Sequence, residues 1–224
     1  MKNFFLLFLT VLYVSCNTSI YKQEQSSKFS GILSEKFIDS LNVAKSSNFK
    51  LEISQYVIED SVNVYFKLFQ KKDTKWKLQQ KYHLSKCCDI PLLTEVQDFN
   101  NDGFNDFTIH YSTVARGAND IRKLFIFDSK RNKYVMIKNS ENYPNLSYNE
   151  KLNCINALSV YGGTTTHFLK LENDSLSEFA HVDYFDGKVS SYKIINGKSV
   201  LLKEIDYDDE DDAMIFFTNY EPIE

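Results

Sequence analysis

The chain has 224 residues, of which 43% are hydrophobic and 15% aromatic, with 7 glycines and 3 prolines. This composition predicts a folded protein and excludes a disordered chain. The formal net charge of −4 argues against a partner held by phosphate contacts, so we expect no nucleic acid and no membrane contact of that kind.

The first 16 residues resemble a bacterial lipoprotein signal peptide. Lys2 supplies a short positive region, and the mainly apolar stretch Phe4–Val14 is too short to span a membrane. The stretch ends in Ser15-Cys16, which is similar to the lipobox, where a small residue precedes a cysteine that receives lipid. We therefore expect lipidation at Cys16. The alternative is ordinary signal cleavage nearby.

The lipoprotein hypothesis divides the chain into residues 1–16 as signal peptide, 17–30 as a polar tether and 31–224 as a single domain. Asn17 follows the cysteine, and it differs from the Asp that retains lipoproteins in the inner membrane. We expect an exported protein that is lipid-anchored to the outer membrane and faces the periplasm or the cell surface. The membrane contact would be made through the lipid anchor only.

Residues 98–106 have the spacing of a calcium-binding loop. Oxygen-bearing groups recur at alternate positions around a sixth-place Gly103, and the expected ligands are Asp98, Asn100, Asp102, the Phe104 carbonyl and Asp106. Because Ca²⁺ prefers six to eight oxygen ligands, this pattern predicts one structural Ca²⁺. An EF-hand is excluded because Ile109 stands where the bidentate Glu is needed. The alternative is a polar turn between two strands.

Three cysteines remain after Cys16, namely Cys87, Cys88 and Cys154. In an oxidising compartment an odd number allows one disulfide and one free thiol. Adjacent Cys87 and Cys88 could pair only through a strained ring, so we predict a bridge from Cys154 to one of them. Three unpaired thiols are the alternative.

Most of the chain after residue 48 alternates between apolar and polar residues, the period of half-buried strands. Strands are predicted over 49–58, 62–69, 76–83, 91–96, 106–111, 124–127, 134–137, 165–171, 176–184, 189–195 and 200–205. Asp186-Gly187 and Asn196-Gly197 predict tight hairpin turns. Residues 31–47 fit a helix or a strand. The pattern predicts one all-β domain, an antiparallel meander of hairpins in a propeller-like or sandwich arrangement.

The acidic run 206–212 has two interpretations. It can be a solvated hairpin tip before a last strand at 213–217. It can also be a surface that attracts a basic partner, since opposite charge speeds association.

From Leu93 to about Leu176 the order of motifs resembles a known family. The calcium loop is followed by Ala115–Asn119, Leu124–Val135, Pro144–Leu152 and the pair Gly162-Gly163. The loop is similar to FG-GAP/VCBS-type calcium loops, and the order is similar to small periplasmic lipoproteins of Gram-negative bacteria with a propeller-like β fold. That family includes an immunity protein that inhibits a lysozyme-like effector.

This resemblance implies a calcium-stabilised envelope protein that binds or inhibits a secreted or periplasmic protein, such as a peptidoglycan hydrolase. The alternative is a structural or accessory envelope lipoprotein without an inhibitory target. Ser159-Val-Tyr161-Gly162 only approximates the S-G-x-Y motif of several lysozyme inhibitors. Because no G-x-S-x-G elbow or H-E-x-x-H motif is present, we do not expect an enzyme.

Overall fold

The computed structural model describes residues 31–45, 47–86, 88–207 and 214–224. Residues Gly31–Glu224 form one compact unit. The predicted signal peptide and tether, with Cys16, lie outside the described residues, as do Cys87 and residues 208–213. Across the described ranges, no helix is both long enough and apolar enough to cross a membrane.

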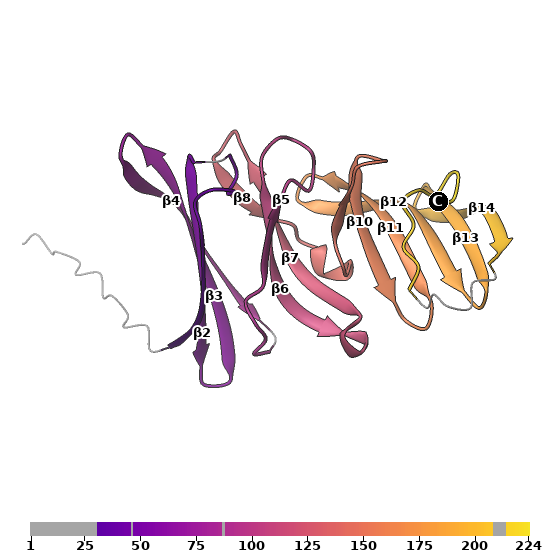
Figure 1. The fold of residues 1–224 in the computed structure, drawn as a ribbon, viewed down its shortest axis with the longest axis horizontal. Coiled ribbons are helices and arrows are strands. Elements are labelled where there is room, and N and C mark those ends of the chain that lie inside the picture. The colour runs from indigo at the N-terminus through magenta and orange to yellow at the C-terminus, as the bar shows by residue number, and fades with distance from the viewer. Residues whose placement is uncertain (1–30, 46, 87, 208–213) are drawn as a thin grey trace, which may run out of the picture. The chain divides into compact units, whose positions relative to one another are not determined.

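Three antiparallel sheets follow one another along the chain, and in each sheet strands that are neighbours in sequence pair with one another (Figure 1). The first sheet contains β1 (Ile32–Asp39), β2 (Phe49–Ile58), β3 (Ser61–Lys72) and β4 (Lys75–Lys86). The middle sheet contains β5 (Thr94–Gln97), β6 (Asp106–Val114), β7 (Asn119–Asp128) and β8 (Lys133–Met136). The last sheet contains β9 (Ser147–Asn149), β10 (Cys154–Val160), β11 (Thr164–Glu172), β12 (Ser175–Phe185), β13 (Lys188–Ile195) and β14 (Lys198–Asp206). The all-β prediction is confirmed.

Two short 3-10 turns complete the described elements. The turn η1 (Ala115–Gly117) connects β6 to β7, and η2 (Ser140–Asn142) lies between β8 and β9. Both are single turns, which is the usual length of this element.

Aromatic rings fill the space between the first and middle sheets. Phe66 of β3 packs edge-on against Phe107 of β6 and Phe125 of β7, with ring centroids 5.3 Å apart in each pair. Phe107 and Phe125 stack at 4.7 Å, and Tyr134 of β8 lies 4.6 Å from Phe107. All four rings are buried. Because large aromatic side chains contribute most to core energetics, this cluster holds the two sheets together.

The middle sheet is buried on both faces. Successive residues of β7 point to opposite sides, so that Phe125 and Phe127 contact the first sheet while Leu124 and Ile126 belong to a second cluster. In the second cluster they pack with residues of the last sheet, including Leu169. A strand covered on both faces has a continuous apolar run in its sequence, as residues 124–127 do.

The C-terminal residues cover the far face of the last sheet. Ile215 and Phe217 are buried in a third cluster with Phe168. The Thr164 hydroxyl donates to the Ile215 carbonyl at 3.0 Å, and the Phe217 amide donates to the Thr166 hydroxyl at 3.1 Å. Residues 215–217 are therefore held to β11 by hydrogen bonds with threonine side chains, and not by the backbone hydrogen bonds that a paired strand would make.

The structure confirms the predicted hairpin turns and most predicted strands. Residues Phe49–Ile58 form β2 with the predicted bounds. Asp186 and Gly187 have φ of 50° and 70°, and Asn196 and Gly197 have φ of 53° and 73°, as tight hairpin turns require. The ambiguous segment 31–47 contains β1.

Two details differ from the predictions, and a third prediction is not tested. Strands β9 and β10 were not expected. The strand expected at 213–217 does not form over the described residues 214–217, because their hydrogen bonds go to threonine side chains of β11. Most of the acidic run, residues 208–212, lies outside the described residues.

Candidate metal-binding loop

The predicted calcium loop, residues 98–106, connects β5 to β6. Gln97 and Asp106 stand opposite each other in the ladder, so the two ends of the loop are held together. Asn101 and Gly103 have φ of 57° and 83°, which turns the chain back within the loop. A Cβ at Gly103 would meet no atom within 4 Å, so the glycine is needed here for its backbone conformation.

Three of the five predicted ligands lie together in the loop. The Asp98 carboxylate accepts hydrogen bonds from the amides of Asp102 at 3.2 Å and Gly103 at 2.8 Å. Asp102 accepts from the Phe104 amide at 2.9 Å and from the Asn100 side-chain amide at 3.1 Å. The loop therefore brings two carboxylates and one amide side chain close to one another.

Asp106 has a different environment, because its carboxylate is fully buried. One oxygen accepts the Phe99 amide at 2.9 Å and the other accepts the Phe127 amide at 2.8 Å. Burial raises the pKa of Asp106 to about 8. The hydrogen bonds from the two amides lower the pKa, and the nearby carboxylates of Asp102 and Asp98 raise it further. Burial is therefore the main cause of the raised pKa, and the Asp102 and Asp98 carboxylates make a smaller contribution in the same direction.

The loop contacts all three sheets. On one side Phe99 is buried in the cluster between the middle and last sheets, and on the other Phe104 packs against the cluster between the first and middle sheets. The Asn105 amide donates to the Ala44 carbonyl, beyond β1, at 2.7 Å. The Asn101 side chain donates to that of Asn153, just before β10, at 3.2 Å. Loop 98–106 is therefore the junction between the sheets.

The donor set of the loop fits a hard cation. Its side-chain donors are carboxylate and amide oxygens, which Ca²⁺ and Mg²⁺ prefer. Among the described residues no group of three or more His, Cys, Asp and Glu is arranged to hold a metal ion. Asp106 is turned toward two backbone amides, so Asp98, Asn100 and Asp102 are the side chains left to meet a cation.

A second polar cluster, which the sequence analysis missed, lies on the last sheet. His167 of β11 and His181 of β12 pair directly across the ladder. Their Nδ1 atoms lie 3.2 and 2.8 Å from one Glu178 oxygen. The other ring nitrogen of His167 lies 3.0 Å from the Ser159 hydroxyl. Periodicity could not find this cluster, because it depends on strand register.

Electrostatics keep Glu178 charged in this cluster. Burial raises the pKa of Glu178, but the hydrogen bonds and charges of His167 and His181 outweigh it and lower the pKa to about 2. Ser159, His167 and Glu178 are connected in the order of a nucleophilic triad. However, His181 shares the same carboxylate oxygen and the Tyr143 ring lies edge-on to His167 at 5.5 Å. We interpret the cluster as structural.

The predicted disulfide from Cys154 to Cys87 or Cys88 is absent, because Cys154 carries a free thiol. Cys154 is buried in the third cluster on the last sheet, whereas residues 87 and 88 directly follow β4 of the first sheet. Its Sγ atom lies 3.5 Å from the Asn156 side-chain oxygen, and burial raises the pKa of the thiol to about 11. The thiol therefore acts as a small core side chain.

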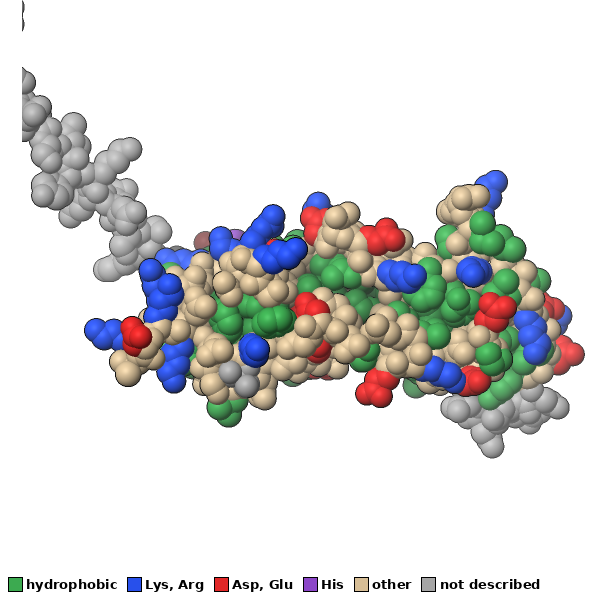
Figure 2. Space-filling model, turned by 90° about the horizontal axis from the view of Figure 1, so that it is seen from above, with side chains coloured by type: hydrophobic (Ala, Val, Ile, Leu, Met, Phe, Trp, Pro, Cys, Tyr) green, Lys and Arg blue, Asp and Glu red, His purple; other side chains and the backbone are tan. Residues whose placement is uncertain are grey.

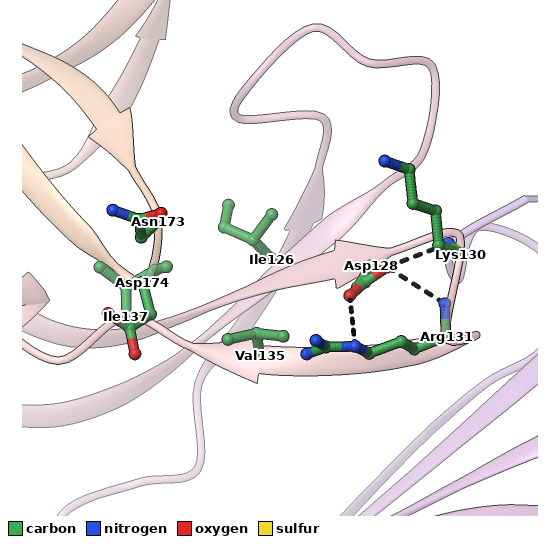
Figure 3. A pocket seen from close by; sticks show the side chains of 8 residues that line it. All are labelled: Ile126, Asp128, Lys130, Arg131, Val135, Ile137, Asn173 and Asp174. Atoms are coloured by element: carbon green, nitrogen blue, oxygen red, sulfur yellow. Dashed lines mark hydrogen bonds and ion pairs between the residues drawn. The ribbon is translucent and has the colours of Figure 1, made fainter.

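A cavity of about 540 Å³ opens between the β7–β8 hairpin and the β11–β12 turn. Figure 3 shows Asp128 and Arg131 on one side and Asn173 and Asp174 on the other, with apolar residues such as Val135 between them. Asp128 accepts the amides of Lys130 and Arg131 at 3.0 and 3.1 Å. Three lining residues are apolar, and the other five are polar or charged, so the recess has a mixed lining.

The fold and loop define an all-β protein of three antiparallel sheets with an oxygen-rich loop at their junction. No family model matches the chain. The chain is 27% identical over 201 residues to the reticulocyte-binding protein homolog 1 of Plasmodium falciparum (isolate 3D7). The match covers 84% of this chain and 6% of that protein, so the chain spans only a small part of this relative.

Among solved structures, the chain is similar to a Xanthomonas type IV secretion system related protein. The likeness covers 77% of this chain and 98% of that chain, with 10% sequence identity and a TM-score of 0.49. At this level the likeness carries no conclusion about function.

The first prediction separates the structural role of Asp106 from cation binding. Asp106→Ala leaves the buried amides of Phe99 and Phe127 without their acceptor, so we expect it to lower the free energy of unfolding by about 2–4 kcal/mol even in chelator. Asp98→Ala, in the more exposed part of the loop, should cost less than half as much in chelator. Urea denaturation of both variants measures the difference. Equal losses would contradict a special role for Asp106.

The second prediction concerns the pH dependence of the Glu178 cluster. Because the pKa is lowered from 4.5 to about 2, the stabilisation is fully present above about pH 5 and is lost as the pH falls through 2. We expect Glu178→Gln to lower the free energy of unfolding by about 1–3 kcal/mol at pH 7, and by less than about half of that at pH 3. Urea denaturation across this range measures the change. A loss that is constant from pH 7 to pH 3 would refute the assignment.

Proposed function

We propose that this chain is an exported, lipid-anchored β protein that binds Ca²⁺ in loop 98–106 and acts at the cell envelope as a binding protein of the inhibitory type. The observation that carries the calcium proposal is the position of the loop, whose residues contact all three sheets. A ligand at such a junction stabilises the native arrangement by mass action. The role of the cation is therefore structural.

Within the loop, the side chains of Asp98, Asn100 and Asp102 and the carbonyl of Phe104 would hold the ion. The cation supplies positive charge that offsets the repulsion between the carboxylates. Asp106 contributes by fixing the loop to β7, through the Phe127 amide. The five residues predicted from the sequence thus have two different tasks.

Two features support a binding role. The signal-like N-terminus with Cys16 supports export to the envelope, where secreted hydrolases act. The cavity beside Asp128 and Asp174 supplies an open recess lined by both apolar and charged side chains. The proposed partner is a secreted or periplasmic protein, such as a peptidoglycan hydrolase. An adjacent hydrolase or toxin gene favours this role, whereas a transport or assembly operon favours the accessory alternative.

The third prediction tests calcium binding. Extracellular calcium modules bind with dissociation constants of about 10⁻⁴–10⁻³ M. With free Ca²⁺ about tenfold above that constant, linkage adds about 1.4 kcal/mol, which raises Tm by a few degrees. Thermal melts with Ca²⁺ and with chelator should differ for the wild type and coincide for Asp98→Ala.

Asp128→Ala is the matched control for this experiment. Asp128 also accepts two backbone amides in a turn, at 3.0 and 3.1 Å, but it lies outside the loop. Its loss should lower Tm equally in both buffers and leave the calcium shift intact. Coincident wild-type melts at millimolar Ca²⁺ would show that the loop is an ordinary turn.

The fourth prediction tests the anchor. Cys16→Ser removes the thiol that would carry the lipid, so we expect loss of labelled fatty acid and release from the membrane fraction. Cys88→Ser, at an exposed position in the domain, is the control and should keep both. Unchanged labelling of the Cys16 variant would refute lipidation at this residue.

A further inference from the structure

The outer face of the first sheet is rich in lysine. Its side chains alternate along β1–β4 with buried core residues such as Leu51 and Phe66. We call this surface the basic face, and its lysines are Lys36, Lys50, Lys67 and Lys81 with the hairpin residues Lys71, Lys72, Lys75 and Lys77. Figure 2 shows Lys side chains gathered at the end of the molecule that the first sheet forms.

Strand pairing places like charges against each other on the basic face. Lys67 stands directly opposite Lys81, and Lys72 stands opposite Lys75. All four side chains are exposed. Like charges directly opposite in an antiparallel pair destabilise a sheet. An anionic partner would relieve this repulsion.

Few carboxylates balance these lysines. Glu52 of β2 accepts a hydrogen bond from Lys50 at 2.7 Å, and the charges of Lys36 and Lys67 also act on it. The hydrogen bond from Lys50 is the main cause that lowers the pKa of Glu52. One carboxylate therefore faces three lysines, and Asp73 is the acidic residue of the adjoining turn. The local charge is strongly positive although the whole chain is acidic.

An exposed tryptophan lies beside these lysines. Trp76 on the β3–β4 hairpin is 38% exposed. The Lys50 ammonium lies 4.5 Å from the Phe69 ring centroid and 5.6 Å from that of Trp76, and the Lys71 ammonium lies 6.0 Å from Trp76. Tryptophan with lysine is the composition that settles at membrane interfaces, and clustered lysines attract anionic headgroups.

We propose that the basic face docks on an anionic lipid surface. A pleated sheet face is broad and open, which matches a membrane plane. The proposal rests on the proposed anchor in one respect. The 14 residues 17–30 can span at most about 50 Å between Cys16 and the start of β1. Because β1 is the edge strand of the same sheet, a lipid at Cys16 would keep the basic face at a high effective concentration near the membrane.

The test uses Trp76, the single tryptophan of the chain, as a local probe. The full-length Cys16→Ser chain, which cannot carry the lipid, is mixed with vesicles of phosphatidylcholine alone or with about one third phosphatidylglycerol. Brominated lipids quench a tryptophan that touches them. We expect quenching on the anionic vesicles to be at least about threefold stronger, and to be lost at about 0.5 M salt, because screening removes exposed charge attraction.

Two double variants locate the binding surface. Lys67→Gln with Lys81→Gln should lower the affinity for anionic vesicles, measured by titrating the quenching with lipid, by about tenfold. This variant removes a like-charge pair, so it should fold at least as well as the parent. Lys198→Gln with Lys203→Gln removes the same charge from exposed positions of β14 and should leave quenching unchanged.

Three results would overturn the proposal. Equal quenching on both vesicle types would assign membrane contact to the apolar stretch at residues 4–14. Equal effects of the two double variants would show that binding to anionic vesicles depends on the net charge of the chain and not on the basic face. A Trp76 response to soluble polyphosphate but not to vesicles would assign the basic face to an anionic polymer. The lipid anchor is tested separately, by fatty acid labelling. Its failure would not affect the vesicle assay, because that assay uses an unlipidated chain.

Discussion

The buried carboxylate of Asp106 is the interaction on which the arrangement of this protein depends. It holds the amide of Phe99, inside the loop, and the amide of Phe127, near the end of β7. Without this pair of hydrogen bonds, the loop would not be fixed against β7. Fixing the loop places Phe99 in one interior cluster and Phe104 against the other. A single polar group thus sets the position of residues that join three sheets.

This geometry explains why a cation in the loop would be a structural element. The middle sheet has no solvent-facing side in its centre, since β7 packs against the first sheet with one set of side chains and against the last sheet with the other. Hydrogen bonds from Asn105 to Ala44 and from Asn101 to Asn153 extend the loop to both neighbours. Restraining the loop therefore restrains both interfaces. A large rearrangement on binding would break two cores at once, so the loop is not suited to a switch.

Much of this architecture could be predicted from local patterns. The alternation of apolar and polar residues predicted most strands of the hairpins, because a strand with one buried face has a hydrophobic period of two residues. Residues 124–127 were predicted only as a strand, and the structure shows that the strand is covered on both sides. Strand β10 escaped prediction because Asn156 is a polar residue in a fully buried position, where its side chain meets Asn149 and the Phe217 carbonyl. Such polar contacts depend on distant segments, and no local pattern reports them.

The same limit applies to the sites. The spacing of residues 98–106 indicated an oxygen-rich loop, but it could not show that Asp106 is engaged by amides from Phe99 and Phe127. The His167–His181 pair and the Lys67–Lys81 pair exist only after strand register is set. The net charge of the whole chain did not indicate the basic face, because it is a sum over sheets that differ in charge. The predicted disulfide failed for a similar reason, because cysteine counting carries no information on which sheet holds Cys154.

Hydrogen exchange of backbone amides with Ca²⁺ and with chelator tests the central claim most directly. If loop 98–106 is the junction of the three sheets, calcium should slow exchange at Asn105 and Phe127 and also in the adjoining strands of the first and last sheets, β1 and β10. Protection that increases in all three sheets is the predicted result. Protection confined to residues 98–106, or unchanged throughout, would contradict the account.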